Sequence, residues 1–360
     1  MVDILRVLLF PLIPVYALVI RIRNLMFEKG YLKQNRVNAF VISVGNIAVG
    51  GTGKTPMVIF LTRLLKDAGM NPGVLSRGYG RISSGYQFVS DGKEFFKTVE
   101  ESGDEIVQTV HDTGVPAAVC EDRTEGAKQF INDAGVKTIV LDDAFQHRYI
   151  ARDVNILILA QRFFYEERTL RKLLLPTGNL REPVSAVERA DIVILNRKFL
   201  KYREPHESVK NHLQGKKVFS AYYKAIGFYD IKRNESLELG EFRGQKGLVV
   251  SGIANTHSFI EALNDIGVDT QNKMIFADHK DYTHKEVQKI RKLFYSTNST
   301  CVITTQKDAV KLQDFKKELD DIDIYYLKIE LMLDDEEKFR NEIIYFYNQH
   351  KTESTAKTVQ

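Results

Sequence analysis

The stretch SVGNIAVGGTGKTP, residues 43–56, decides the fold of this chain. It follows an apolar, strand-like run at 39–44, and helical periodicity continues after it to position 68. A glycine-rich turn between a strand and a helix brings several backbone N–H groups to one point, where they can surround phosphate groups. The stretch therefore predicts a phosphate-binding loop, or P-loop, on the first strand of an α/β domain.

Each residue type in this loop suits one part of a bound nucleotide. The residues expected to hold it are Gly50, Gly51, Thr52, Gly53, Lys54 and Thr55. The Lys54 ammonium suits the β- and γ-phosphates, and the Thr55 hydroxyl suits Mg²⁺. The usual pattern has a glycine where this chain has Ala48. That departure is minor, because GGTGKT after a strand is already specific.

A carboxylate for the metal is expected at the end of a neighbouring strand. The run TIVLDD at 138–143 is apolar until it reaches Asp142 and Asp143. Either aspartate is a candidate Mg²⁺ ligand, and a turn or helix-capping role is the alternative for each. His147 follows within the next few residues and is expected beside the same strand end.

Strand and helix patterns alternate on both sides of the loop. Strand-like runs lie at 39–44, 73–75, 117–119, 138–141, 154–159 and 192–195, with helical patterns at 54–68, 104–110 and 123–134. Further strands at 217–223, 227–231, 248–251, 273–276, 301–304 and 324–327 alternate with helices at 258–263, 284–293 and 336–348. This predicts a P-loop NTPase-like parallel sheet with helices on both faces, followed by a smaller C-terminal α/β unit.

These patterns divide the chain into four expected segments. They are an N-terminal membrane-associated segment at 1–36, a P-loop core domain at 37–215, a smaller α/β domain completing the active site at 216–350, and a polar tail at 351–360. A length of 360 residues agrees with two domains of roughly 150 residues each.

The N-terminal stretch 8–20 carries no charge and is followed by Arg21 and Arg23. As a helix it would span roughly 20 Å, which is less than the hydrocarbon core of about 30 Å. Pro11 and Pro14 are also expected to kink it. The absence of a small-x-small cleavage site disfavours a signal peptide. We therefore predict a segment that dips into the membrane surface, with a buried core helix as the alternative.

Composition excludes several classes of protein. Hydrophobic residues make up 44% and charged residues 27%, which is ordinary for a globular protein and excludes a disordered chain, collagen and a coiled coil. The net charge of +4 is too small to indicate nucleic-acid binding, so no nucleic-acid partner is expected. Cys120 and Cys301 lie in apolar runs and are expected to be buried thiols, too few for a disulfide framework.

Two other P-loop subclasses carry short motifs of their own. A GTPase carries a guanine-reading Asn/Thr-Lys-x-Asp segment, which Thr305-Gln-Lys-Asp308 matches only superficially and in the second unit. A membrane-associated partitioning ATPase usually has lysine at the place of Val49. Neither motif supports its subclass strongly.

Ordered blocks along the chain are more specific than any single motif. They are SVGNIAVGGTGKTP (43–56), SRGYG (76–80), GDE (103–105), LDDAFQHR (141–148), LPTGNLREP (175–183), SGIANTHSF (251–259), FADHKDYT (276–283) and TTQKDAVKL (304–312). With the apolar N-terminal stretch, they make the chain resemble the tetraacyldisaccharide 4′-kinases, the lipid A 4′-kinases of Gram-negative bacteria, over nearly its whole length.

The resemblance implies a reaction and its catalytic residues. The family transfers the ATP γ-phosphoryl group to the 4′-hydroxyl of a tetraacylated glucosamine disaccharide 1-phosphate, with Mg²⁺, at the cytoplasmic face of the inner membrane. By resemblance Asp104 is the base, paired with His279, and Lys54 completes the catalytic set. A carboxylate at a helix start near a P-loop suits this role, since it can accept the proton of the hydroxyl.

A phosphoglycolipid acceptor implies cations outside the nucleotide loop. The candidate substrate-binding residues are Arg77, Tyr79, Arg123, Arg181 and His147. Glu182 is a candidate second-shell carboxylate for Mg²⁺ or an ion-pair partner of Arg181. The expected partners are the lipid substrate and the membrane surface, and the protein is expected to be a monomer. The alternative function is a membrane-associated nucleotide-switch ATPase or GTPase without a small acceptor.

The chain also departs from the family pattern. Ala144 stands where many members have glycine, Lys280 where many have a second histidine, and Gln306 where glutamate is common. Thr177 and Asn179 replace residues that are usually small or proline. Lys280 leaves His279 as the histidine candidate at its place, and Gln306 makes a metal or base role at that position doubtful.

Overall fold

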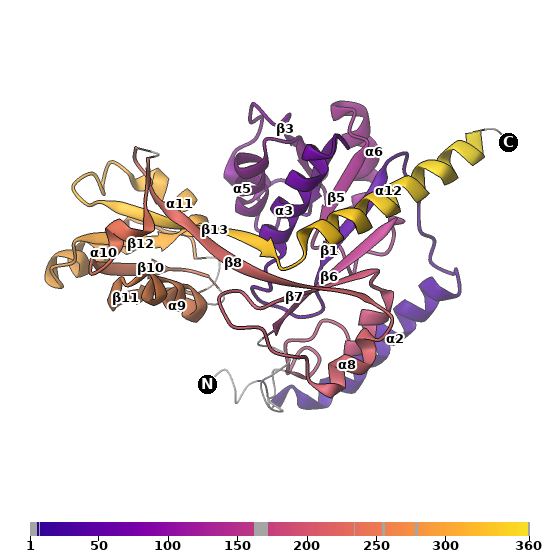
Figure 1. The fold of residues 1–360 in the computed structure, drawn as a ribbon, viewed down its shortest axis with the longest axis horizontal. Helices are drawn as coiled ribbons and strands as arrows, with labels where there is room; N and C mark the ends of the chain where they lie inside the picture. The colour runs from indigo at the N-terminus through magenta and orange to yellow at the C-terminus, as the bar shows by residue number, and fades with distance from the viewer. Residues whose placement is uncertain are drawn as a thin grey trace. The chain divides into compact units, whose positions relative to one another are not determined.

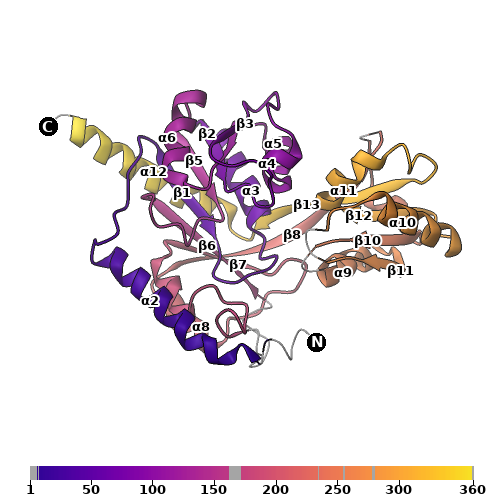
Figure 2. The ribbon, with the colours of Figure 1, turned by 180° about the vertical axis from the view of Figure 1, so that it is seen from behind.

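The structure is a computed structural model that describes residues 6, 8–161, 172–233, 235–253, 256–277 and 280–358. They form two compact units (Figure 1, and seen from behind in Figure 2). The larger comprises Met1–Arg197, Lys201–Ala221 and Leu333–Gln360, and the smaller comprises Lys198–Leu200 and Tyr222–Met332. The smaller unit thus ends earlier than the domain expected at 216–350, because the C-terminal helix packs on the larger unit.

The larger unit is built on one sheet. Its strands are β1 (Phe40–Gly45), β2 (Pro72–Ser76), β3 (Gln87–Ser90), β4 (Ala117–Val119), β5 (Thr138–Asp142), β6 (Val154–Ala160), β7 (Ile192–Asn196) and the start of β8 (Lys217–Asp230). Their order is β8-β7-β6-β1-β5-β2-β4-β3. All these pairs are parallel except β3 with β4, so the predicted parallel sheet is confirmed and gains an antiparallel edge.

Helices cover both faces of this sheet. The helices of the larger unit are η1 (Phe10–Leu12), α2 (Ile13–Glu28), α3 (Lys54–Asp67), α4 (Val99–Ser102), α5 (Asp104–Thr113), α6 (Arg123–Ala134), η3 (Val184–Arg189), α8 (Glu207–Leu213) and α12 (Glu336–Thr358). Successive side chains of a strand point to opposite faces. Accordingly, Phe40 packs on Tyr347 of α12, with ring centroids 5.3 Å apart, whereas Val41 packs in the cluster that contains Phe130 of α6.

Helix α12 accounts for the part of the chain expected to be a polar tail. It continues to Thr358 and crosses in front of the large sheet in Figure 1. Phe339 is fully buried, and His350 Nδ1 lies 3.1 Å from Asp153 Oδ1. These contacts with the sheet explain why the helix extends beyond the stretch predicted at 336–348.

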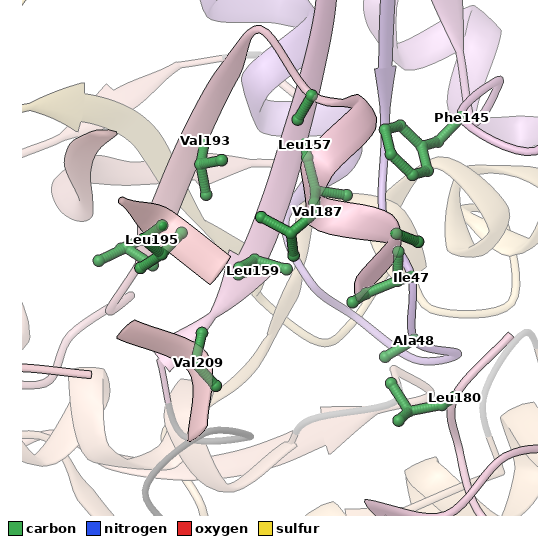
Figure 3. Packing of buried hydrophobic residues seen from close by; sticks show 13 residues of the cluster. Ile47, Ala48, Phe145, Leu157, Leu159, Leu180, Val187, Val193, Leu195 and Val209 are labelled. Atoms are coloured by element: carbon green, nitrogen blue, oxygen red, sulfur yellow. The ribbon is translucent and has the colours of Figure 1, made fainter. Parts of the chain in front are cut away.

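A core cluster under η3 and α8 holds the base of the glycine-rich loop. Figure 3 shows Val187 of η3 among Leu157 and Leu159 of β6, with Ile47 and Ala48 close to Leu180. Ile47 and Ala48 are almost completely buried. The first residues of the loop are therefore fixed in the hydrophobic core, and only its later part is free to face a ligand.

The smaller unit is also built of alternating strands and helices. It contains the rest of β8, β9 (Ser236–Leu237), η4 (Leu239–Phe242), β10 (Lys246–Ser251), α9 (Thr256–Ile266), β11 (Asp269–Ile275), α10 (His284–Ser296), β12 (Cys301–Thr305), α11 (Gln306–Leu312), η5 (Gln313–Phe315) and β13 (Ile324–Leu333). The order is β11-β10-β12-β13-β8, with β9 beside β8. The strands expected at 217–223 and 227–231 are one continuous strand, β8.

Helix α2 exposes its apolar side, which is the reverse of an ordinary surface helix. The large side chains of α2 that are about half exposed or more include Val15, Leu18, Val19, Ile22 and Leu25, and Phe27 is the one buried residue of α2. The stretch Phe10–Glu28 is long and apolar enough to cross a membrane, judged by length and composition. The alternative of a buried core helix is therefore wrong.

The two prolines do not kink this segment. Pro11 lies at the start of η1 and Pro14 at the start of α2. Proline is tolerated in the first turn of a helix, where its missing N–H would have no helical partner. The predicted kink is therefore absent from the described part of the segment.

Candidate nucleotide-binding site

The glycine-rich loop connects β1 to α3 through two left-handed glycines. Gly50 has φ 106° and Gly53 has φ 100°, which residues with a side chain rarely adopt. The Thr52 N–H donates to Gly50 O at 2.9 Å, and Gly53 is the N-cap of α3. Lys54 and Thr55 then begin the helix, so backbone N–H groups and the positive end of the helix dipole face the same place.

Two buried asparagines support the loop from within. Asn46 Nδ2 donates to Thr52 Oγ1 at 2.7 Å, and Asn196 Nδ2 donates to Thr52 O at 2.9 Å. Both asparagines are at most 1% exposed. They were not predicted as site residues, although each lies at or just beyond the carboxyl end of a strand, where ligand sites of parallel sheets gather.

The segment 175–183, which contains the predicted substrate-binding residue Arg181, pairs with the first half of the loop. The Val49 N–H donates to Asn179 O and the Arg181 N–H donates to Ile47 O, each at 2.8 Å. Between them, Ala48 and Leu180 form an antiparallel bridge. The alanine that departs from the usual P-loop glycine therefore places its methyl group in the core beside Leu180.

Asp142 and Asp143 lie at the carboxyl end of β5, next to the loop. Asp142 pairs in register with Val44 of β1 and is 2% exposed. Its Oδ1 is buried without a hydrogen-bond partner among the described residues. Burial, and then the nearby carboxylates of Glu105 and Asp143, raise the pKa of Asp142 to about 7. Glu105 thus belongs to the electrostatic surroundings of the site, a role the sequence did not predict.

Asp143 is held by two cations. Its backbone is left-handed, with φ 47°, a conformation that aspartate tolerates better than most residues. Arg181 Nη1 lies 3.0 Å from both carboxylate oxygens, and Lys54 Nζ lies 3.8 Å from Oδ2. The loop lysine and a predicted substrate-binding arginine therefore meet on one carboxylate.

The carboxylate pair fits a divalent cation. Mg²⁺ prefers oxygen ligands and is usually held by one or two carboxylates together with substrate phosphates. The unsatisfied Oδ1 of Asp142 supplies such an oxygen, and a bound cation would favour its ionised form. Thr55, in the first turn of α3, is the other candidate ligand and is half-buried.

Glu182 does not belong to this pair. It is 1% exposed, and its two oxygens accept from Arg189 at 2.7 and 2.9 Å and from Asn24 at 3.1 Å. The predicted ion pair with Arg181 is wrong, because Arg181 turns to Asp143 and Arg189 takes its place. Both oxygens of Glu182 accept from these donors, and its expected second-shell role toward Mg²⁺ stays a prediction.

The remaining predicted substrate residues differ in exposure. Arg123 is 2% exposed and donates to the backbone oxygens of Cys120 and Asp142 at 2.7 and 3.3 Å. Burial lowers its pKa to about 10. Its guanidinium therefore supports the end of β5 from inside, whereas Arg77 and Tyr79 are exposed to solvent.

His147 is a half-buried neutral imidazole. Burial, with the Arg123 cation as the second cause, lowers its pKa to about 4. Its Nδ1 is buried and has no hydrogen-bond partner among the residues described. A neutral ring suits hydrogen bonding to a sugar hydroxyl better than ion pairing with phosphate.

Asp104 begins α5 and is 9% exposed. Its Oδ1 accepts from the Glu105 N–H at 3.0 Å, so the carboxylate stands at the positive end of the helix dipole. Its expected partner, His279, lies outside the described residues. The pairing of these two groups stays a prediction.

Asp308 has a structural role that excludes guanine reading. It is 2% exposed and accepts from Tyr282 Oη at 3.0 Å, from Thr305 Oγ1 at 2.6 Å and from the Gly252 N–H at 3.1 and 3.2 Å. A carboxylate with both oxygens engaged inside the smaller unit has no capacity left for a base. The TQKD segment is thus a helix start, with Thr305 as the N-cap of α11.

The loop, its lysine and the adjacent carboxylates define a P-loop nucleotide-binding protein. The sequence profile of the tetraacyldisaccharide-1-P 4′-kinases matches residues 5–347, and the chain belongs to this family.

Known proteins along nearly the whole length support this membership. The tetraacyldisaccharide 4′-kinase of Desulfatibacillum aliphaticivorans is 34% identical, over 91% of this chain and 89% of its own. That of Aquifex aeolicus is 32% identical, over 93% and 97%. The crystal structure of the "apo" form of LpxK from Aquifex aeolicus in complex with ATP superposes with a TM-score of 0.74 at 31% identity, covering 95% of this chain and 99% of that one.

Proposed function

We propose that this protein transfers the γ-phosphoryl group of ATP to the 4′-hydroxyl of a tetraacyl glucosamine disaccharide 1-phosphate, a step of lipid A biosynthesis. The observation that carries the proposal is the meeting of Lys54, Asp143 and the unsatisfied Asp142 carboxylate beside the glycine-rich loop. Family membership identifies the expected acceptor, since relatives that match nearly the whole chain are named for this substrate.

In the proposed mechanism the chain mainly positions groups and neutralises charge. The loop amides and Lys54 hold the β- and γ-phosphates, and Thr55 with Asp142 or Asp143 holds Mg²⁺, which supplies further neutralisation of the phosphate charge. The 4′-oxygen attacks the γ-phosphorus as the bond to the β-phosphate oxygen breaks, and ADP leaves. Asp104, paired with His279, accepts the hydroxyl proton.

The acceptor is expected to be held by groups around the same strand ends. Arg77, Tyr79 and His147 are the candidates with accessible side chains, and Arg181 joins them if Lys54 and Asp143 turn to ATP and metal. Arg123 acts from beneath by supporting Asp142 O.

Product formation tests the function directly. The full chain is incubated in detergent micelles with γ-labelled ATP, Mg²⁺ and the tetraacyl disaccharide 1-phosphate, and the label is expected in the lipid. Release of label only as inorganic phosphate, with no labelled lipid, would favour the nucleotide-switch alternative.

We further propose that α2 seats the protein, as a monomer, on the cytoplasmic face of the inner membrane. Its outward face offers Val15, Leu18 and Leu25, and Arg21 is exposed beside them. Burial of such side chains contributes about 1.5–3 kcal/mol each, and each basic residue adds about 1 kcal/mol near anionic lipid. The acyl chains of the substrate then remain in the bilayer while the sugar reaches the site.

Replacing Leu18 and Leu25 with glutamate tests this seating. We expect recovery with anionic phospholipid vesicles to fall at least about tenfold, because two large apolar contacts are lost and charge is added. Ile82→Glu is the matched control, since Ile82 is 79% exposed and lies beside α4, where its N–H donates to Glu100 O. Equal vesicle recovery of the double variant and the wild type would refute the proposed seating.

A further inference from the structure

The inner face of α2 is polar, and it contacts the segments that carry the nucleotide site. Tyr16 Oη donates to Arg181 O at 2.9 Å, and Asn24 Nδ2 donates to Glu182 Oε2 at 3.1 Å. Arg23 donates to Gln146 O. These three side chains and Phe27 share one face of the helix by their spacing, opposite the exposed apolar residues.

From these contacts two short routes lead to the loop. Arg181 donates from its backbone to Ile47 O at 2.8 Å and from its guanidinium to Asp143 at 3.0 Å. Gln146 Nε2 donates to Asn46 O at 2.8 Å, and Asn46 in turn holds Thr52. The segments that α2 contacts are thus connected to the site by one hydrogen bond through Arg181 to Asp143, and by two through Gln146 and Asn46 to Thr52.

Asn24 forms hydrogen bonds with two buried, oppositely charged side chains, those of Glu182 and Arg148. Its amide N–H donates to Glu182, and its Oδ1 accepts from Arg148 Nη1 at 3.3 Å. The Arg148 guanidinium lies 4.8 Å from the centre of the Phe27 ring. Hydrogen bonds from Arg189 and then from Asn24 keep the pKa of Glu182 below its usual range in spite of burial. An asparagine suits this place because it offers a donor and an acceptor without a charge of its own.

We propose that Asn24 and Tyr16 are positioning residues for the nucleotide site, so that helix α2 orders the loop as well as contacting the membrane. Their hydrogen bonds to Arg181 and Glu182 fix the segment 179–182, which pairs with Ile47 and Val49. The same contacts hold the Arg181 guanidinium against Asp143. This rests on the proposed function only in taking ATP as the nucleotide. The proposal assigns different roles to the two faces of α2. The outer face contacts the membrane, and the inner face positions the residues that bind ATP.

Asn24→Asp tests the proposal with little change of shape. It places a carboxylate against the Glu182 carboxylate, and we expect the dissociation constant of the ATP analogue AMP-PNP with Mg²⁺ to rise about tenfold, the order for a lost hydrogen bond to a buried charge. The KM for ATP rises with it, while recovery with vesicles stays unchanged. Tyr16→Phe removes one hydrogen bond to a backbone oxygen, and about a threefold rise is expected.

Leu25→Asn is the matched control from the outer face, since Leu25 adjoins Asn24 and is 50% exposed. It is expected to lower vesicle recovery and leave the AMP-PNP affinity unchanged. An AMP-PNP affinity within twofold of wild type in Asn24→Asp overturns the proposal. If that variant unfolds at a clearly lower temperature, Tyr16→Phe decides by the same criterion. A wild-type chain that binds no AMP-PNP contradicts the proposed function instead.

Discussion

Replacing Lys54 with alanine is expected to lower the rate of phosphoryl transfer about a thousandfold, the upper range for loss of one group that stabilises transition-state charge. The physical reason is that Lys54 is the cation of the loop and points toward the carboxylates proposed to hold Mg²⁺, with Nζ 3.8 Å from Asp143 Oδ2. With ATP bound, the same ammonium is expected on the β- and γ-phosphates, where charge moves as the bond to ADP breaks. The measurement is kcat with labelled ATP and saturating lipid acceptor.

The fold is expected to survive this change. Asp143 keeps its contact with Arg181 at 3.0 Å, so this carboxylate is not left without a cation. Lys66→Ala serves as control at the other end of the same helix, because Lys66 Nζ donates to Thr113 O and Gly114 O and not to the site. That variant is expected to lose a little thermal stability and no activity. A Lys54→Ala chain with more than a tenth of wild-type kcat contradicts the assignment of Lys54.

Features fixed by short stretches of chain could be predicted from sequence, and features fixed by distant pairing could not. The loop was predictable because phosphate binding needs glycines, a lysine and a hydroxyl at adjacent positions of a strand–helix turn. Asn196 was not, since it meets Thr52 across 144 positions of the sequence through the register of the sheet. Glu105 lies in the GDE motif at 103–105, but its proximity to Asp142 depends on how α5 packs.

The N-terminal helix shows the same division. Its apolar composition predicted contact with a membrane, and the exposed side chains of Leu18 and Leu25 agree with that. The sequence did not show that Tyr16 and Asn24 turn inward, because two polar residues on an apolar helix could equally face water at the membrane surface. Only their partners Arg181 and Glu182, more than a hundred residues away, reveal the orientation.

Asp104→Asn is expected to lower kcat by about a hundredfold to ten-thousandfold, the range for removal of a general base. Asparagine keeps the shape, and its amide oxygen still accepts from the Glu105 N–H, the bond that Asp104 Oδ1 now accepts at 3.0 Å. The helix loses one negative charge at its first turn, a cost of about 0.3–1 kcal/mol. Binding of AMP-PNP should therefore be unchanged while transfer of labelled phosphate to the lipid slows by that factor.

This substitution separates catalysis from helix capping, which is the other reading of an aspartate at a helix start. Asp91→Asn is the control, because Asp91 accepts from the Lys93 and Glu94 N–H groups at 2.8 Å in an exposed turn. If Asp104 served only the start of α5, both variants would lose similar, small amounts of thermal stability and retain kcat. A base role predicts that only the Asp104 variant loses transfer, with its melting temperature close to that of wild type. Retention of wild-type kcat by Asp104→Asn would move the proton acceptor to another group, with Glu105 as the next carboxylate to replace.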